Sequence, residues 1–239
     1  MLNIDDYFIG LTIGVRFRAN FSIEDQLGSM VDEILYAKNS FFNSKVFPQV
    51  RSRVGSKILF NEKTQNRMEI DNSNIILDVN FNDGSFKKDD CELLKRMFEE
   101  QIVNRIMKNF KIKEIVRIGY VKRFVYEMEN LANTFVNKTI GGTLGGINDI
   151  NLSFSKKFTT PEGLIKKDVH DYDNVIFNII KKSDLQEIFI AIDYQCYYHP
   201  FLNDISELNI KHFYDRAESF SCGKYIDWLN KNYLEVSNA

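Results

Sequence analysis

The feature that most constrains the fold is a run of strand-like segments joined by very short connections. Residues 49–62, 67–70 and 74–82 are rich in β-branched and aromatic residues, and the turn-forming stretches NEKTQN and DNSN separate them. Strands joined by such short turns pair antiparallel, because a parallel neighbour needs a crossover of a dozen or more residues. This part of the chain therefore predicts an antiparallel meander.

Further strands are expected on both sides of the meander. Residues 7–18 alternate arginines with Val15 and Phe17, a period of two that indicates a strand with one face in water. A long strand is predicted over 114–128, followed by a short helix over 130–139. Three more strands are predicted over 150–159, 174–181 and 185–198.

Three amphipathic segments predict long helices that cover the sheet. Apolar residues recur at helical spacing over 22–38, 90–110 and 206–234, with Ser22 as an N-cap of the first. The element order, β-α-β-β(β)-α followed by β-(α)-β-β-β-α, predicts an α+β fold with mainly antiparallel sheet in one or two lobes. We place the lobes at residues 1–113 and 114–239, which can also form one continuous domain.

Composition restricts the function only weakly. The chain has 31 Lys+Arg and 33 Asp+Glu, a formal net charge of −2, so its total charge favours neither a nucleic-acid nor a membrane partner. The N-terminus has no basic region followed by a cleavage site, and no apolar run reaches the length of a membrane helix, so a cytoplasmic protein is expected. Cys91, Cys196 and Cys222 are far apart, which argues against a disulfide framework or a zinc site.

Motifs for catalysis or cofactor binding do not fit. The glycine-rich segment 141–146 (GGTLGG) has no lysine after it and precedes a predicted strand, so a mobile loop is expected rather than a phosphate-binding one. His170 stands in a lone His-Asp pair, and His212 falls within the apolar periodicity of a helix, as a core histidine does. Asp193 and His199 flank the end of a strand and could meet. We expect no cofactor, and these patterns disfavour an enzyme.

Basic residues recur on three of the predicted strands. Residues two or six positions apart share one face of a strand, so neighbouring strands would gather these side chains into a phosphate-binding patch. The candidates are Arg16, Arg18, Arg51, Arg53, Arg117, Lys122 and Arg123. Phe17, Tyr120 and Phe124 lie between them, although Phe17 would point to the other face. The alternative is a solvated face balanced by carboxylates such as Asp78 and Glu62.

The C-terminal tract is rich in large aromatic side chains. Many of them belong in a core, but too many lie off a single helical stripe for all to be internal, and aromatic residues are common anchors of protein interfaces. This pattern predicts a surface for a homo-oligomer or another protein partner. The candidate interface residues are Phe201, Phe213, Tyr214, Tyr225, Trp228 and Tyr233.

Three stretches resemble a sporadically distributed family of uncharacterised bacterial proteins of similar length. They are residues 117–124 (RIGYVKRF), residues 190–193 (IAID) and the helical pattern that runs from Leu208 to Leu229, and the resemblance covers mostly 114–234. Where that family often has Arg-Tyr-Ile-Asn after the glycine, this chain has Tyr-Val-Lys-Arg at 120–123. The resemblance implies no reaction and no catalytic residues. The family's patchy distribution implies accessory genes, such as those of antiviral defence.

Together these features predict a non-catalytic binding or assembly component of an accessory bacterial system that acts through protein–protein contacts. The alternative is a nucleic-acid-binding protein with an arginine-lined sheet face. A metal-dependent hydrolase or nuclease is a third alternative.

Overall fold

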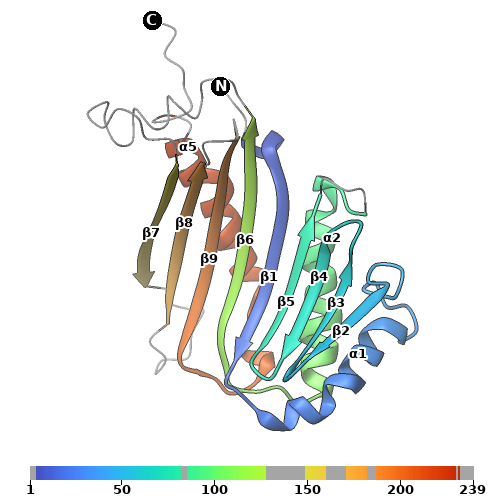
Figure 1. The fold of residues 1–239 in the computed structure, drawn as a ribbon. Helices are drawn as coiled ribbons and strands as arrows, with labels where there is room; N and C mark the ends of the chain where they lie inside the picture. The colour runs from blue at the N-terminus through green and yellow to red at the C-terminus, as the bar shows by residue number, and fades with distance from the viewer. Residues whose placement is uncertain are drawn as a thin grey trace, which may run out of the picture.

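One antiparallel sheet organises the chain (Figure 1). The structure is a computed structural model, and it describes residues 4–81, 85–127, 149–159, 171–181, 187–229 and 231. The sheet has nine strands in the order β2-β3-β4-β5-β1-β6-β9-β8-β7, and every neighbouring pair is antiparallel. The strands are β1 (Phe8–Phe17), β2 (Gln49–Arg53), β3 (Ser56–Asn61), β4 (Asn66–Asp71), β5 (Asn74–Asn80), β6 (Ile115–Glu127), β7 (Ile150–Thr159), β8 (Tyr172–Lys181) and β9 (Glu187–Leu202).

The two halves of the chain meet at the centre of this sheet. β1 pairs with β5 on one side and with β6 on the other, so that Gly14 lies directly opposite Gly119. The sheet is therefore continuous across the predicted boundary between residues 113 and 114.

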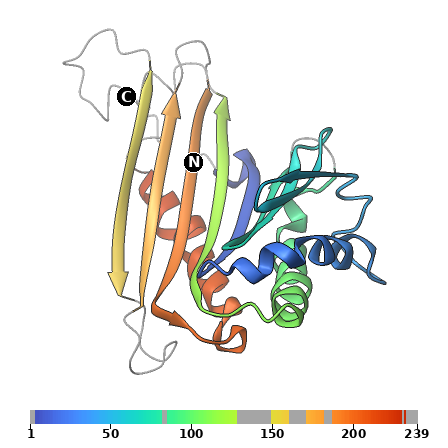
Figure 2. The ribbon, with the colours of Figure 1, turned by 60° about the horizontal axis from the view of Figure 1, so that its bottom comes forward.

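The described helices pack against one face of the sheet (Figures 1 and 2). They are α1 (Leu27–Tyr36), α2 (Cys91–Met97) with a π-helical continuation (Phe98–Met107), α4 (Ile210–Glu218), a second π-helical segment (Ser219–Lys224) and α5 (Tyr225–Leu229). The α+β prediction, with a mainly antiparallel sheet covered by three long helical stretches, is thus confirmed. None of these helices in the described part of the chain is long and apolar enough to cross a membrane.

The ends of the helices differ in detail from the prediction. Asn20, not Ser22, caps the first stretch, because its side-chain oxygen accepts a hydrogen bond from the Ser22 backbone N–H at 3.0 Å. A 3-10 turn (Phe21–Gln26) precedes α1. The third stretch is interrupted at Gly223, which has a non-helical conformation (φ −106°, ψ −106°) between α4 and α5.

The period of two in each strand separates a core face from a face without helices. On β1 the core face presents Leu11, Ile13, Val15 and Phe17, which are at most 1 % exposed. The intervening residues belong to the opposite side of the sheet, which we call the open face. No helix among the described residues covers the open face (Figure 2).

Two buried polar clusters attach α4 to the core face. In the first, Arg216 forms a bidentate ion pair with Asp173 of β8, at 3.0 and 3.1 Å, and the Tyr194 hydroxyl donates to the same carboxylate at 2.6 Å. In the second, the Glu218 carboxylate contacts Lys122 at 2.6 Å and Lys95 at 3.2 Å, and accepts a hydrogen bond from the Tyr120 hydroxyl. Burial raises the pKa of the hydroxyls of Tyr120 and Tyr194.

Candidate nucleic-acid interface

Most of the predicted arginines lie on the open face, where the register of the strands places them. Arg16 on β1 and Arg117 on β6 are directly opposed partners, and Arg123 lies on the same side of β6. Arg51 and Arg53 are exposed on β2, at the far edge of the sheet. The structure therefore brings Arg16 and Arg117 together, whereas Arg123 lies six residues away along β6, roughly 20 Å, and the β2 pair lies several strands away.

Arg18 and Lys122 lie elsewhere. Arg18 follows β1 and pairs with Glu114 at 3.7 Å, with both side chains exposed. Lys122 is one position from Arg123 and so points to the core face, where it is 6 % exposed and pairs with Glu218. The prediction that Lys122 belongs to the phosphate-binding patch is therefore wrong. The aromatic residues expected between the arginines, Phe17, Tyr120 and Phe124, are likewise buried in the core.

Arg123 has a structural role on the open face. Its guanidinium forms an ion pair with Asp78 and donates hydrogen bonds to the Thr12 hydroxyl oxygen at 2.8 Å and to the Val79 carbonyl at 2.9 Å. The Asp78 carboxylate also forms an ion pair with the Arg67 guanidinium, at 3.2 Å. A Cβ at Gly10 would collide with Arg123, so this glycine makes room for the guanidinium. Arg123 thus ties β6 to β5 and its charge is already neutralised.

Arg16 and Arg117 belong to a line of side chains that crosses the sheet. Consecutive strand pairings place Asn74, Arg16, Arg117, Tyr197 and Tyr172 side by side across β5, β1, β6, β9 and β8. We call these five residues the transverse row. The row combines positive charge and aromatic rings on the one face of the sheet that the described helices leave uncovered.

The aromatic half of the transverse row is held between two cations. The rings of Tyr172 and Tyr197 stack with centroids 4.8 Å apart and an interplanar angle of 9°. The Arg117 guanidinium lies 5.6 Å from the Tyr197 centroid, and the Lys157 ammonium of β7 lies 5.1 Å from the Tyr172 centroid. Such contacts fix long basic side chains at little cost in entropy, so the cations are held ready for an anion.

A chain of hydrogen bonds extends from the row along β9. Arg117 donates to the Tyr197 hydroxyl at 3.2 Å, which donates to the Gln195 side-chain oxygen at 2.7 Å. The Gln195 amide in turn donates to the Asp193 carboxylate. Burial raises the pKa of Asp193, while the Gln195 bond and the Arg117 charge oppose that shift.

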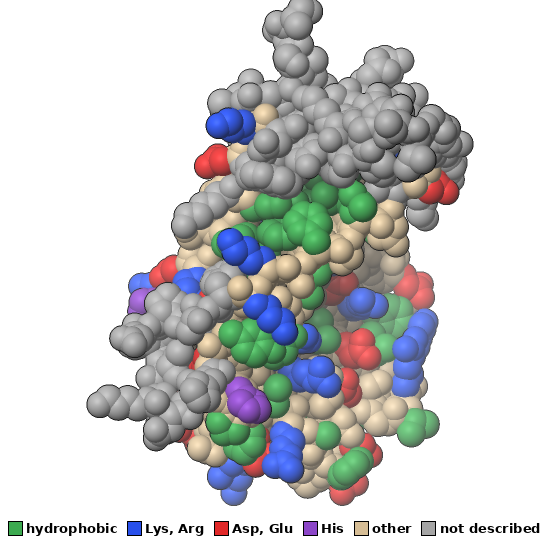
Figure 3. All heavy atoms as spheres, turned by 90° about the vertical axis from the view of Figure 1, so that its left-hand side faces the viewer, with side chains coloured by type: hydrophobic (Ala, Val, Ile, Leu, Met, Phe, Trp, Pro, Cys, Tyr) green, Lys and Arg blue, Asp and Glu red, His purple; other side chains and the backbone are tan. Residues whose placement is uncertain are grey.

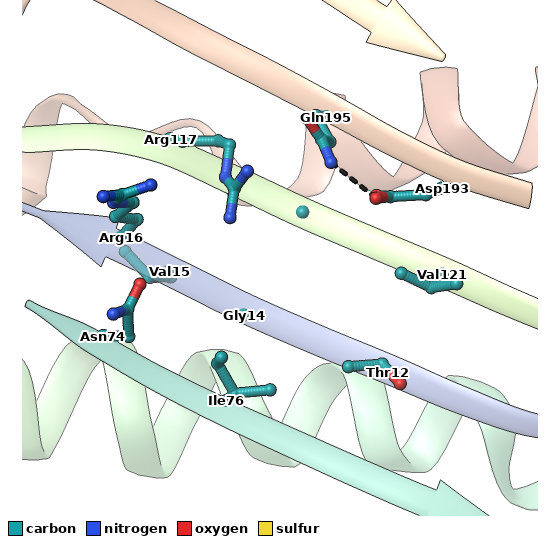
Figure 4. Close-up of a pocket in the computed structure, with 11 residues that line it drawn as sticks. Thr12, Gly14, Val15, Arg16, Asn74, Ile76, Arg117, Val121, Asp193 and Gln195 are labelled. Carbon is teal, nitrogen blue, oxygen red and sulfur yellow. Dashed lines mark hydrogen bonds between the residues drawn. The ribbon is translucent and has the colours of Figure 1, made fainter. Parts of the chain in front are cut away.

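Beside the row lies a depression of about 100 Å³ that we call the glycine hollow (Figure 4). Gly14 and Gly119, which face each other across β1 and β6, form its floor. Arg16 and Arg117 stand at one end, and the side chains around the remainder are Thr12, Asn74, Ile76, Val121, Asp193 and Gln195.

The two glycines of the floor differ in whether neighbouring side chains leave room for a Cβ atom. A Cβ at Gly14 would lie 3.2 Å from Ile76, a tight contact, whereas a Cβ at Gly119 would meet no heavy atom within 4 Å. Neither residue has a positive φ. Glycine inside a strand costs stability and often marks a place where a ligand approaches the backbone closely. Packing within the described chain therefore accounts for Gly14 but leaves Gly119 unexplained.

The C-terminal aromatic residues are mostly core. Phe213, Tyr214 and Tyr225 are 1 %, 6 % and 6 % exposed, because α4 and α5 press them against the sheet. Phe201 is half-buried at the end of β9. The side chain of Trp228 and the whole of Tyr233 lie outside the described residues. The three buried rings are thus packed within this chain and are not available to a partner.

The other candidates from the sequence do not assemble into a site. Asp193 and His199 lie six residues apart on β9, roughly 20 Å along the strand, so they do not meet. His212 is exposed on α4 instead of buried. Segments 130–139 and 141–146 and His170 lie outside the described residues. Within the described ranges, no group of three His, Cys, Asp or Glu side chains is arranged to hold a metal ion.

Basic side chains do not dominate the side of the molecule at the β7 edge. Seen from the β7 edge, Lys and Arg are interspersed with Asp and Glu (Figure 3). This agrees with the net charge of −2. Any attraction for an anion must therefore come from local arrangements such as the Arg16–Arg117 pair.

The sequence prediction did not include Tyr172, Tyr197, Lys157 or Gly119. The one indication in the sequence was the alternation along a strand: Asp193, Gln195 and Tyr197 are two residues apart and therefore share one face of the sheet. No protein-family model matches this chain, and no curated protein matches it either.

Proposed function

We propose that the protein binds nucleic acid across the open face of its sheet, with Arg16 and Arg117 contacting phosphate groups. The observation that carries this proposal is that these two arginines are directly opposed partners on neighbouring strands. Like charges opposite each other destabilise a sheet, and neither arginine forms an ion pair with another described residue. An anion bound between them would turn the repulsion into attraction.

The surroundings of the pair support a polyanion rather than a single small anion. Arg51 and Arg53 on β2 and Lys157 on β7 are exposed on either side of the centre. Adjacent strands lie about 4.8 Å apart, so these cations cover more than 30 Å across the sheet. A DNA strand carries one phosphate per roughly 3.4 Å, and several phosphates would therefore lie within this width.

Binding should be strongly dependent on salt. In fluorescence anisotropy with labelled duplex and single-stranded oligonucleotides, we expect log K to fall linearly with log salt, because phosphate contacts release counterions. Arg16→Ala and Arg117→Ala should each reduce the magnitude of the slope by about 0.9 on duplex DNA and lower affinity for all sequences.

Arg96→Ala is the matched control, because Arg96 is exposed on α2 and the charge change is the same. It should leave the salt slope unchanged. Absence of binding at low salt, where electrostatic attraction is strongest, would refute the proposal. So would equal effects of Arg96→Ala and Arg16→Ala.

Association of two copies is a second candidate, and the edge strand β7 favours it. β7 is ten residues long and has a neighbour only on the β8 side among the described strands. Phe154 on this strand is 43 % exposed and packs on Phe177 at 4.9 Å. Antiparallel pairing of two β7 strands would give a symmetric dimer and cover Phe154. A dimer of this kind would suit the assembly role in an accessory bacterial system.

Light scattering after size-exclusion chromatography tests this candidate. We expect a dimer whose dissociation constant rises at least tenfold in Phe154→Lys, since burying a charge in place of an aromatic ring is unfavourable. Phe21→Lys is the control, because Phe21 is 73 % exposed and lies in the 3-10 turn that follows β1, a strand separated from β7 by β6, β9 and β8. A monomer at all concentrations would exclude association through β7.

A further inference from the structure

We infer that the glycine hollow holds a cytosine base of a single-stranded nucleic acid, with Asp193 accepting from its amino group and the Arg16–Arg117 pair contacting a neighbouring phosphate. The inference rests on the proposed function and names the ligand of the same surface. It requires a single strand, because a base paired within a duplex cannot enter a hollow in a sheet.

The size of the hollow suits one pyrimidine ring. Its volume is about 100 Å³, and it opens to solvent on the open face. A closed cavity of roughly 150 Å³ accommodates a benzene ring, so an open hollow of this volume takes a six-membered ring that protrudes partly into water. Ile76 and Val121 provide apolar contacts at the rim of the hollow.

The floor allows a flat ring to lie against the backbone. With glycine at positions 14 and 119, no Cβ projects from the floor of the hollow. Since a Cβ at Gly119 would meet no heavy atom within 4 Å, the packing of the described residues leaves this position free for a ligand. The aromatic ring of a base would occupy the space that a side chain fills elsewhere in the sheet.

The polar groups are placed at two ends that match a nucleotide. Arg117 and Val121 are four residues apart on β6, about 13 Å along the strand, and Asp193 is the β9 partner of Val121. The cationic end suits a phosphate, and the carboxylate at the other end suits a hydrogen-bond donor. Cytosine offers its N4 amino group there, and Asp or Glu commonly accepts from this group.

Thymine is the discriminating comparison. It has a carbonyl oxygen where cytosine has the amino group, so it would place one acceptor against another at Asp193. The Gln195 amide, which donates to Asp193, keeps that carboxylate oriented toward the hollow. Preference for cytosine over thymine is therefore the property that this geometry predicts.

The test compares oligo-dC and oligo-dT, each of about fifteen nucleotides, by fluorescence anisotropy at one fixed salt concentration and pH 7.5. We expect about tenfold tighter binding of oligo-dC, the size of a good side-chain contact to a base. Asp193→Asn should remove this preference. Glu69→Gln, on the open face of β4, makes the same change of charge and should leave the dC:dT ratio unchanged.

Filling the hollow gives an independent result. Gly119→Val should lower oligo-dC affinity to that of oligo-dT or below, and Gly119→Ala, for which there is open space, should lower it less while remaining folded. Equal affinities of the wild-type protein for the two oligonucleotides, with a normal salt slope, would overturn this inference and leave the proposed function standing. A dC preference that survives Asp193→Asn and both Gly119 changes would also overturn it. No binding of either oligonucleotide at low salt would refute the proposed function itself.

Discussion

Arg216→Met is expected to lower the free energy of unfolding by about 3–5 kcal/mol, the usual cost of breaking a buried ion pair. Asp173 is fully buried, and the Arg216 guanidinium contacts both of its carboxylate oxygens. Removing the guanidinium leaves the negative charge of Asp173 in the core. The hydrogen bond from the Tyr194 hydroxyl stabilises that charge much less than the guanidinium does. Urea denaturation followed by circular dichroism measures the loss.

A second substitution distinguishes lost charge balance from lost packing. In Asp173→Asn/Arg216→Met no net charge is left buried, and the amide oxygen can still accept from Tyr194, so much of the stability should return. Lys211→Met is the matched control, as Lys211 is exposed on the same helix and should change stability by less than about 0.5 kcal/mol. A double variant as unstable as Arg216→Met would show that packing by the arginine stem dominates.

Glu218→Ala should destabilise the protein by about 3 kcal/mol, at the lower end of the same range because the side chain is 23 % exposed. The change removes the carboxylate that Lys122, Lys95 and the Tyr120 hydroxyl all contact. Lys95 keeps Glu92 as a partner, so part of the charge in this cluster stays compensated.

The conservative variant Glu218→Gln retains an acceptor and should lose only about 1–2 kcal/mol. Asp215→Ala, an exposed acidic residue on the same helix, serves as the control for charge and helix propensity. The measurement is again denaturant unfolding at pH 7. A loss in Glu218→Ala no larger than that in Asp215→Ala would contradict the assigned role of the second cluster.

The sequence was sufficient to predict the elements and the face on which a strand residue lies, but not which strands become neighbours. Hairpin-length turns made the meander predictable, but the segment predicted as one strand over 49–62 is two strands, β2 and β3, separated by a turn at Val54 and Gly55. The pairing of β1 with β6 joins segments far apart in the chain. The transverse row depends on that pairing. Arg16 and Arg117 could be named from the sequence, but the stacking of Tyr172 on Tyr197 beside them could not.

Two predictions, the phosphate-binding role of Lys122 and the interface role of Phe213 and Tyr214, failed because of the tertiary structure. Lys122 is adjacent to Arg123 in sequence and therefore on the opposite face, where Glu218 of α4 compensates its charge. Phe213 and Tyr214 are neighbours on α4 and both are buried, since Phe213 contacts Tyr194 of the sheet and Tyr214 contacts Tyr120. A helical stripe cannot reveal that a helix lies in a groove with apolar walls on more than one side.

The central position of β1 has a consequence for the synthesis of the protein. The strand emerges from the ribosome early, and its partner β6 follows roughly a hundred residues later, about 5–20 s at ordinary rates of translation. During that interval the nascent chain can pair β1 with β5 but must leave its other edge open. Newly made chains therefore present a ten-residue edge capable of joining a strand of another chain, and completion of β6 removes this hazard.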